Sequence, residues 1–194
     1  LSPRVFVCRG DKGTVEFRPA IRADGLPAFE FVDVWDFGPP AEAVRHCSYT
    51  YHIPFGPFGL TTSRDPNLAV AADRSPWIMS PAANPTAWQT FRPDSVGNGG
   101  VRLGTSDQAR IGNSVTHQKD GQNVLFLDGR VSFEKRAFCG VDMDNIYAIS
   151  RDVIDGDAWG LRPTLDAACA PANKNDSVLV HDPNVFPPPI GPRH

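Results

Sequence analysis

The sequence predicts an α+β fold that is mainly β, with a small antiparallel sheet and long loops between its strands. Short runs rich in β-branched and aromatic residues alternate with turn residues, as they do in strand proteins. The 17 glycines and 19 prolines are scattered without a period, so they divide the chain into short elements. With 194 residues and 41% apolar side chains, the chain is long enough to bury a core, which excludes collagen-like and disordered classes.

The first half of the chain holds several candidate strands and one candidate helical turn. The segment "CSYTYHI" is the clearest, because strict alternation places three residues on each side of a strand. The segment "NLAVAAD" is a short apolar run that ends in a carboxylate. We expect strands at Pro3–Cys8, Thr14–Phe17, Phe29–Trp35, Cys47–Ile53 and Asn67–Asp73, and a helical turn at Ala41–His46.

Residues 117–135, "HQKDGQNVLFLDGRVSFEK", predict a β-hairpin. Asn123–Leu127 and Arg130–Glu134 flank Asp128-Gly129, a pair that favours the type I′ turn of two-residue hairpin loops.

This turn would make Phe126 face Val131 and Val124 face Phe133 across the two strands. These four side chains would then share one apolar face, because side chains alternate along a strand. We expect that face to lie on a core, since a slip of one residue would expose it to water.

The rest of the chain is expected to consist mostly of loops. Residues 93–116 form a glycine-rich surface loop before the hairpin, residues 140–177 form an acidic loop region, and "SVLV" at 177–180 is a last candidate strand. The sequence therefore predicts one globular domain over residues 1–180 and a proline-rich tail over residues 181–194.

Charge and hydropathy exclude two classes of function. The net charge of -3 and the lack of a basic cluster argue against nucleic-acid binding, because phosphates require a basic face. No apolar run approaches the roughly 20 residues that span a bilayer. The chain begins with neither methionine nor a signal-like segment, so we expect its N-terminus to be cut.

The four cysteines show no CxxC spacing, which favours disulfides over a zinc finger. Three connectivities are possible, and proximity along the chain favours Cys8 with Cys47 and Cys139 with Cys169. Each bridge would stabilise the fold by about 3 to 4 kcal/mol in the chain-entropy model. Disulfides imply an oxidising compartment, the periplasm or cell surface. The alternative is four buried free thiols in a cytosolic protein.

With these features together, the sequence resembles the bacterial prepilin-like proteins that carry a motif of His, about nine residues, then Asp-Gly. The match runs from His117 through "GQNVLFLDGRVSFEK" into "FCGVDMDNIYA", with "PRVFVC", "CSYTY" and "NLAVAADRSPW" upstream, and it covers most of residues 3–150. The spacing departs from the motif, because ten residues separate His117 from Asp128.

Members of that family resemble type IV pilins and type II secretion pseudopilins, in which a mostly β head lies on a long apolar N-terminal helix. The resemblance implies that this chain is such a pilin-like globular head without its helix. It further implies a non-enzymatic component of an envelope filament or secretion pseudopilus, located in the periplasm or at the cell surface. Its partners would be other pilin-like subunits or envelope proteins, and it would meet the membrane only through that helix.

His117 has three possible roles. A hydrolase would require an activated nucleophile, and the chain contains no GxSxG, so we expect no catalytic residue. The other readings are metal ligation and a structural role in which the imidazole bonds to backbone and fixes the loop before the hairpin. We favour the structural role. The same role is expected for the other motif residues, Asn123, Phe126, Asp128, Gly129 and Phe133.

Two ligand classes remain open. Oxygen ligands in a flexible loop suit calcium, and some pseudopilins bind calcium near this position, although the spacing here is not that of an EF-hand. The candidate calcium ligands are Asp142, Asp144, Asp152, Asp155 and Asp157, and a solvated acidic loop is the alternative. No other cofactor is expected.

A secreted module that binds carbohydrate or protein is the alternative function, because aromatic rings stack on sugars. The candidate rings are Trp35, Tyr49, Tyr51, Trp77, Trp88 and Trp159.

Overall fold

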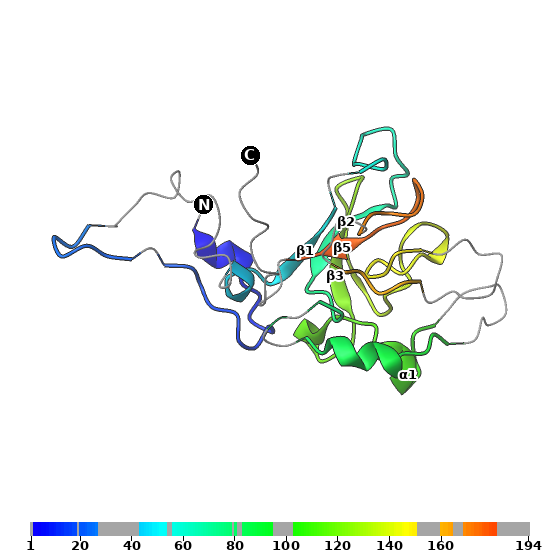
Figure 1. The fold of residues 1–194 in the computed structure, drawn as a ribbon, viewed down its shortest axis with the longest axis horizontal. Coiled ribbons are helices and arrows are strands. Elements are labelled where there is room, and N and C mark those ends of the chain that lie inside the picture. The colour runs from blue at the N-terminus through cyan, green and yellow to red at the C-terminus, as the bar shows by residue number, and fades with distance from the viewer. Residues whose placement is uncertain are drawn as a thin grey trace, which may run out of the picture.

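The structure is a computed structural model that describes residues 2–18, 20–26, 43–53, 56–78, 80, 83–94, 103–150, 160–164 and 169–181. These residues form one antiparallel sheet of five strands in the order β4-β3-β2-β1-β5 (Figure 1). The strands are β1 (Tyr49–His52), β2 (Ala69–Asp73), β3 (Gln122–Phe126), β4 (Val131–Glu134) and β5 (Leu179–Val180). The mainly β prediction is therefore confirmed.

Helix is scarce among the described residues. It comprises the one-turn α1 (Asp107–Arg110) and the 3-10 helices η1 (Pro3–Phe6), η3 (Ala43–Arg45), η4 (Pro85–Gln89), η5 (Val115–His117) and η6 (Val141–Met143). The first four strands are neighbours in sequence order, and β5 returns by a long connection to pair with β1, as the last strand of a Greek key does.

Several predicted elements are confirmed, and two are wrong. Strands β1, β2 and β5 and the turn η3 lie where the sequence predicts them, whereas Phe29–Trp35 lies outside the described residues. Pro3–Cys8 is not a strand, because proline fits the first helical turn and the Ser2 hydroxyl caps it by accepting from the Arg4 N–H at 3.3 Å. Thr14–Phe17 is also not a strand, although the Val15 N–H donates to the Arg45 carbonyl at 2.8 Å.

The hairpin forms, but its predicted register is wrong by one residue. Leu125 pairs with Val131 and Val124 pairs with Ser132, and the Phe126 N–H donates to the Arg130 carbonyl at 2.9 Å. Residues 127–129 therefore form a three-residue loop, in which Gly129 takes the left-handed conformation with φ of 85°. Such a three-residue loop ends in a glycine bulge, whereas the predicted type I′ turn has only two loop residues.

The new register places the four expected apolar side chains on two faces rather than one. Val124 and Phe126 are 0% and 2% exposed and point into the core, whereas Val131 and Phe133 are 64% and 47% exposed on the other side. We call the first side the core face and the second the outer face.

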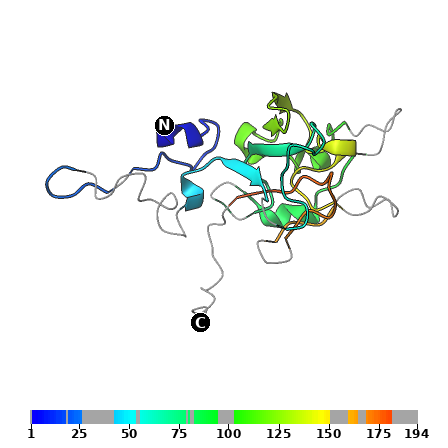
Figure 2. The same ribbon diagram turned by 90° about the horizontal axis from the view of Figure 1, so that it is seen from above.

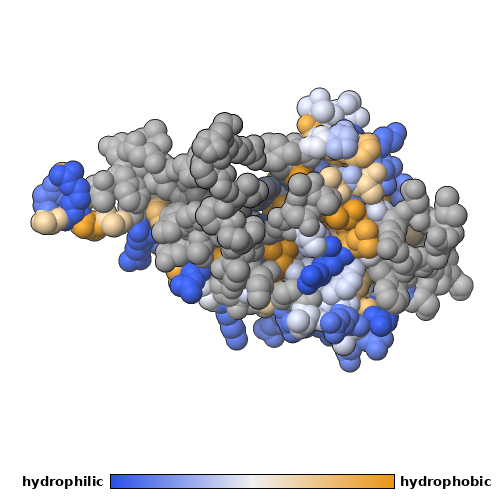
Figure 3. Space-filling model, viewed as in Figure 1, coloured by the Kyte–Doolittle hydropathy of each residue, from blue (hydrophilic) through white to orange (hydrophobic). Residues whose placement is uncertain are grey.

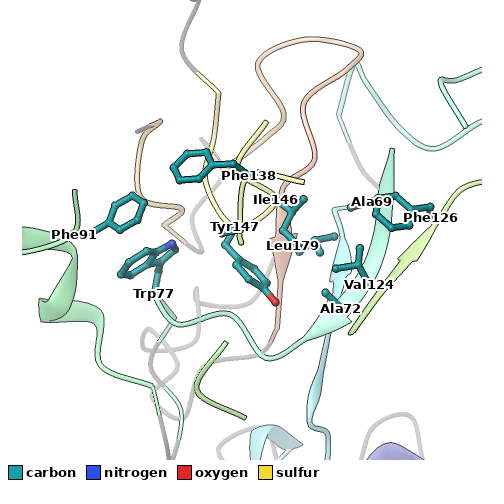
Figure 4. Close-up of a cluster of buried hydrophobic side chains, with 11 residues drawn as sticks. Ala69, Ala72, Trp77, Phe91, Val124, Phe126, Phe138, Ile146, Tyr147 and Leu179 are labelled. Carbon is teal, nitrogen blue, oxygen red and sulfur yellow. The ribbon is translucent and has the colours of Figure 1, made fainter. Parts of the chain in front are cut away.

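The core face packs on loops rather than on a helix (Figure 4). Figure 4 shows Val124, Ala72 and Ala69 on the strands, with Tyr147 and Leu179 between them and a group of aromatic rings. Trp77 lies at 5.1 Å from the Phe91 ring centroid, and Phe91 stacks on Phe138 at 6.0 Å. The residues that cover this face come from segments after β2 and after β4. A second, smaller cluster consists of Ile53, Ile78, Val178 and Val180.

The loop before the hairpin is not wholly at the surface, contrary to the prediction for residues 93–116. Residues 95–102 lie outside the described residues, but Asn113, Ser114 and Thr116 are 0 to 2% exposed. The Asn113 amide donates to the Lys135 carbonyl at 3.0 Å, which ties the loop to the end of β4. Burial of this segment fixes the position of η5 and of His117.

The N-terminal segment is joined to the sheet by a buried ion pair. The Arg74 Nε donates to Asp11 Oδ2 at 3.0 Å, and both side chains are 0% exposed. The guanidinium also donates to the Thr14 hydroxyl and to the Val44 and Cys47 carbonyls. Figures 1 and 2 show residues 20–26 projecting away from the sheet beyond this anchor point.

Candidate functional site

His117 ends the turn η5, directly before the hairpin. The Ser114 hydroxyl caps this turn by accepting from the Thr116 N–H at 3.2 Å. The two residues after His117 both have left-handed backbone, with φ of 57° at Gln118 and 65° at Lys119. Such angles are uncommon for non-glycine residues. The tight turn brings the imidazole back over the outer face of the sheet.

The imidazole contacts side chains rather than backbone. Its Nε2 lies 3.1 Å from Asp73 Oδ2 and 3.2 Å from the Asn123 Nδ2, and its ring meets Phe133 edge to face at 5.6 Å. The expected bond from His117 to backbone is therefore wrong, although the residue does fix the loop against the hairpin. The His117 side chain is 30% exposed.

Asp73 ends β2 and is the buried carboxylate of the site. Its Oδ2 accepts from the Asn123 N–H at 2.6 Å and from the Asn123 Nδ2 at 3.1 Å. Its Oδ1 is buried and has no hydrogen-bond partner among the described residues. Burial raises the pKa of Asp73, and the bonds from Asn123 and the neighbouring His117 offset part of that rise.

Cys8 brings the N-terminal segment to the same place. Its N–H donates to the Ser48 hydroxyl at 3.0 Å, which fixes the backbone beside the start of β1. Its sulfur, a carboxylate oxygen of Asp73 and a ring nitrogen of His117 all lie within 4.8 Å of one another. Within the described ranges, this is the one group of three or more side chains that could hold a metal ion.

The motif residues have separate roles. Asn123 belongs to the site, Phe133 supports the imidazole, and Phe126 belongs to the core. Asp128 and Gly129 form the turn, where Asp128 Oδ1 accepts from the Arg130 N–H at 2.9 Å. Sequence reasoning found His117 and Asn123 through the motif but did not connect them with Cys8 or Asp73.

The expected disulfides are not formed in this structure, in which Cys8, Cys47, Cys139 and Cys169 carry no disulfide bond. Cys8 instead faces Asp73 and His117. Cys139 packs on the main core cluster and Cys169 on the second one, so the two thiols lie against different groups of side chains. Burial raises the pKa of the Cys139 thiol, which keeps it protonated.

The expected calcium ligands are not gathered within the described residues. Asp152, Asp155 and Asp157 lie outside those residues, and Asp142 is exposed. Asp144 Oδ2 accepts from the Ser177 N–H at 2.7 Å. The charge of Asp176, whose carboxylate accepts from the Ser150 and Ala172 N–H groups, raises the pKa of Asp144. In the part of the chain that the structure describes, no cluster of three or more possible ligands includes Asp142 or Asp144.

The carboxyls of Asp144 and Asp176 predict a pH-dependent stability. Burial and the charge of Asp176 raise the pKa of Asp144, and burial raises the pKa of Asp176 to about 6. The native state therefore keeps protons that the unfolded chain has lost, so these groups lower stability as pH rises from about 4 through 6. We expect Asp144→Asn to raise the free energy of unfolding at pH 7 by about 1 to 3 kcal/mol.

Urea denaturation at pH 4 and pH 7 measures this effect. Asparagine can still accept from the Ser177 N–H, so the gain should vanish near pH 4, where the carboxyls are protonated. Asp142→Asn, at an exposed position, is the control and should change stability by no more than about 0.5 kcal/mol. An equal gain at both pH values would contradict the electrostatic explanation.

The aromatic residues do not form a sugar-binding platform within the described residues. Trp77 is 1% exposed and contacts Trp88 and Phe91 in the core, so its faces cannot stack on a pyranose. Tyr51 is 47% exposed, Tyr49 is partly buried, and Trp35 and Trp159 lie outside the described residues.

Comparison of the chain with family models, curated proteins and solved structures found no match to any of the three. In the described part of the chain, no helix has the length and apolar character needed to cross a membrane.

Proposed function

We propose that this chain is the non-enzymatic globular head of a pilin-like or pseudopilin-like protein of the cell envelope. In this proposal, the outer face of the sheet packs on an apolar helix in an envelope filament or secretion pseudopilus at the periplasm or cell surface. The observation that carries it is a row of exposed and partly exposed apolar side chains across that face.

The row runs across four strands. Tyr51 pairs with Ala71, Ala71 pairs with Leu125, and Leu125 pairs with Val131, so these four side chains point to the same side. Val131 is 64% and Tyr51 47% exposed, while Ala71 and Leu125 are partly buried. Phe133 adds a further aromatic ring beside the row. Figure 3, seen from the same side as Figure 1, shows apolar and hydrophilic residues side by side on the described part of the surface.

An exposed apolar row of this kind indicates a partner surface. Soluble monomers rarely expose contiguous apolar patches larger than a few hundred Å², and larger patches mark interaction faces. A row of this kind suits the apolar side of a helix, which presents one stripe of side chains to a sheet.

The path of the N-terminal segment supports the same face. Asp73 lies two residues after Ala71 on β2, where it pairs with Tyr49. Side chains two residues apart on a strand point to the same side, so Asp73 also belongs to the outer face. Cys8 lies beside Asp73. The helix that the family resemblance implies comes before this segment in the chain, so it would approach the sheet on the outer face.

Val131→Glu tests this proposal in the full-length protein, in the cells that produce it. We expect incorporation into high-mass envelope assemblies, measured by chemical cross-linking, to fall at least about tenfold, because burying a charge against a helix costs more than about 1.4 kcal/mol. Folding should be unaffected, since Val131 is 64% exposed.

Val15→Glu is the matched control. Val15 is 56% exposed but lies in the N-terminal segment, outside the sheet, so its substitution should leave cross-linking unchanged. Normal incorporation of the Val131 variant, or an equal loss in the Val15 variant, would contradict the proposed role of the outer face.

A further inference from the structure

We propose that Cys8, Asp73 and His117 bind one divalent cation of the zinc class through three protein ligands, leaving a fourth position open to solvent. The site does not depend on the proposed assembly role, because none of its three ligands belongs to the row of Tyr51, Ala71, Leu125 and Val131.

The ligand chemistry suits zinc. A thiolate, a carboxylate and a neutral imidazole are the three ligand types that zinc accepts, and zinc sites are tetrahedral with bonds of about 2.0 to 2.3 Å. Such bonds place ligand atoms about 3.3 to 3.8 Å apart. The three ligand atoms here lie within 4.8 Å of one another, and His117 Nε2 is already 3.1 Å from Asp73 Oδ2. Small side-chain shifts would therefore complete the geometry.

The unpartnered oxygen of Asp73 is a second, independent observation. The Asp73 side chain is 0% exposed, and its Oδ1 has no hydrogen-bond partner among the described residues. Buried polar atoms are usually paired, so this oxygen is available to a ligand. The charges also match, because one thiolate and one carboxylate balance a divalent cation without further counter-ions.

Neighbouring groups hold the ligands in place. The backbone and side-chain amides of Asn123 both donate to Asp73, the Ser48 hydroxyl accepts from the Cys8 N–H, and the Phe133 ring packs against the imidazole. Such supporting contacts orient ligands in metal sites. His117 is 30% exposed and Cys8 is partly buried, so a cation and a water molecule can reach the site from solvent.

Metal binding and the expected Cys8–Cys47 disulfide exclude each other, because a disulfide sulfur is not a thiolate ligand. Cation binding would join three segments that are distant in the sequence, namely the N-terminal segment, β2 and η5. We therefore expect zinc to stabilise the docking of the N-terminal segment on the sheet.

Titration of the reduced 194-residue chain with Co²⁺, after treatment with chelator, tests the site. We expect one equivalent to bind with a thiolate-to-cobalt charge-transfer absorption, and Zn²⁺ to displace it. Cys8→Ser should abolish that absorption, and His117→Gln should weaken binding at least about tenfold. Zn²⁺ should raise the unfolding temperature of the native chain but not that of Cys8→Ser, with circular dichroism showing that both are folded.

Cys47→Ser is the control. Cys47 is also partly buried and lies between η3 and β1, but it is not one of the three proposed ligands. It should bind Co²⁺ with native affinity. The proposal is overturned if the native chain gives no thiolate absorption, if Cys8→Ser retains it, or if Cys47→Ser loses it equally. Peptide mapping that finds Cys8 in a disulfide in the protein as isolated from its cells would also overturn it.

Discussion

Phe126→Asp is expected to unfold the domain, whereas Phe133→Asp is expected to leave it folded. Phe126 is 2% exposed and packs in the main core cluster, while Phe133 is 47% exposed on the outer face. A carboxylate at position 126 would lose the burial of an aromatic ring, about 3 to 5 kcal/mol, and would add the penalty for a buried unpaired charge. That sum is comparable with the whole stability of a typical domain.

Urea denaturation followed by tryptophan fluorescence measures both variants under the same conditions. Trp77 lies in the same cluster as Phe126, so its emission reports loss of the core. We expect Phe133→Asp to lose no more than about 1 kcal/mol, because its ring is half exposed. The observed hairpin register is contradicted if the two substitutions destabilise the chain equally, since the alternative register places both rings on one face.

The existence of the hairpin could be predicted from sequence, but its register could not. Asp-Gly is favourable both in the centre of a two-residue turn and at the last two positions of a three-residue loop. The two loops differ by one residue in strand register, so choosing the other loop moves every side chain of one strand to the opposite face of the sheet. In the structure, Gly129 adopts φ of 85° and the longer loop forms. This leaves Ser132, rather than Phe133, opposite Val124, where the loops pack on the sheet.

The candidate site was only partly visible in the sequence. The motif indicated His117 and Asn123, because they lie in one recognisable segment. Asp73 was noticed only as the end of an apolar strand, and Cys8 was assigned to a disulfide by its distance along the chain. Neither residue is near His117 in sequence. They meet it because β2 pairs with β3 and because Cys8 lies beside the end of β2, and both facts depend on long-range packing.

Arg74 is a second residue whose importance depends on tertiary structure, and it carries the other large expected effect. Its side chain is fully buried with Asp11, although nothing in the local sequence distinguishes it from a surface arginine. Asp11→Asn would leave the guanidinium in the interior without its counter-charge. Breaking a buried pair from one side typically costs about 3 to 5 kcal/mol, so we expect a loss of that size in the free energy of unfolding.

The double variant Asp11→Leu with Arg74→Met separates the charge effect from the loss of packing. Buried ion pairs can be replaced by apolar side chains of similar volume with little loss, so the double variant should recover much of the stability that Asp11→Asn loses.

Asp120→Asn is the surface control, because its pair with Arg110 is solvent-exposed and worth no more than about 1 kcal/mol. Limited proteolysis should cut the N-terminal segment of Asp11→Asn faster than that of the native chain, since Arg74 also binds Thr14 and the Val44 carbonyl. If Asp11→Asn is as stable as Asp120→Asn, the N-terminal segment is not anchored by this ion pair, and the position of Cys8 over the sheet must depend on other contacts.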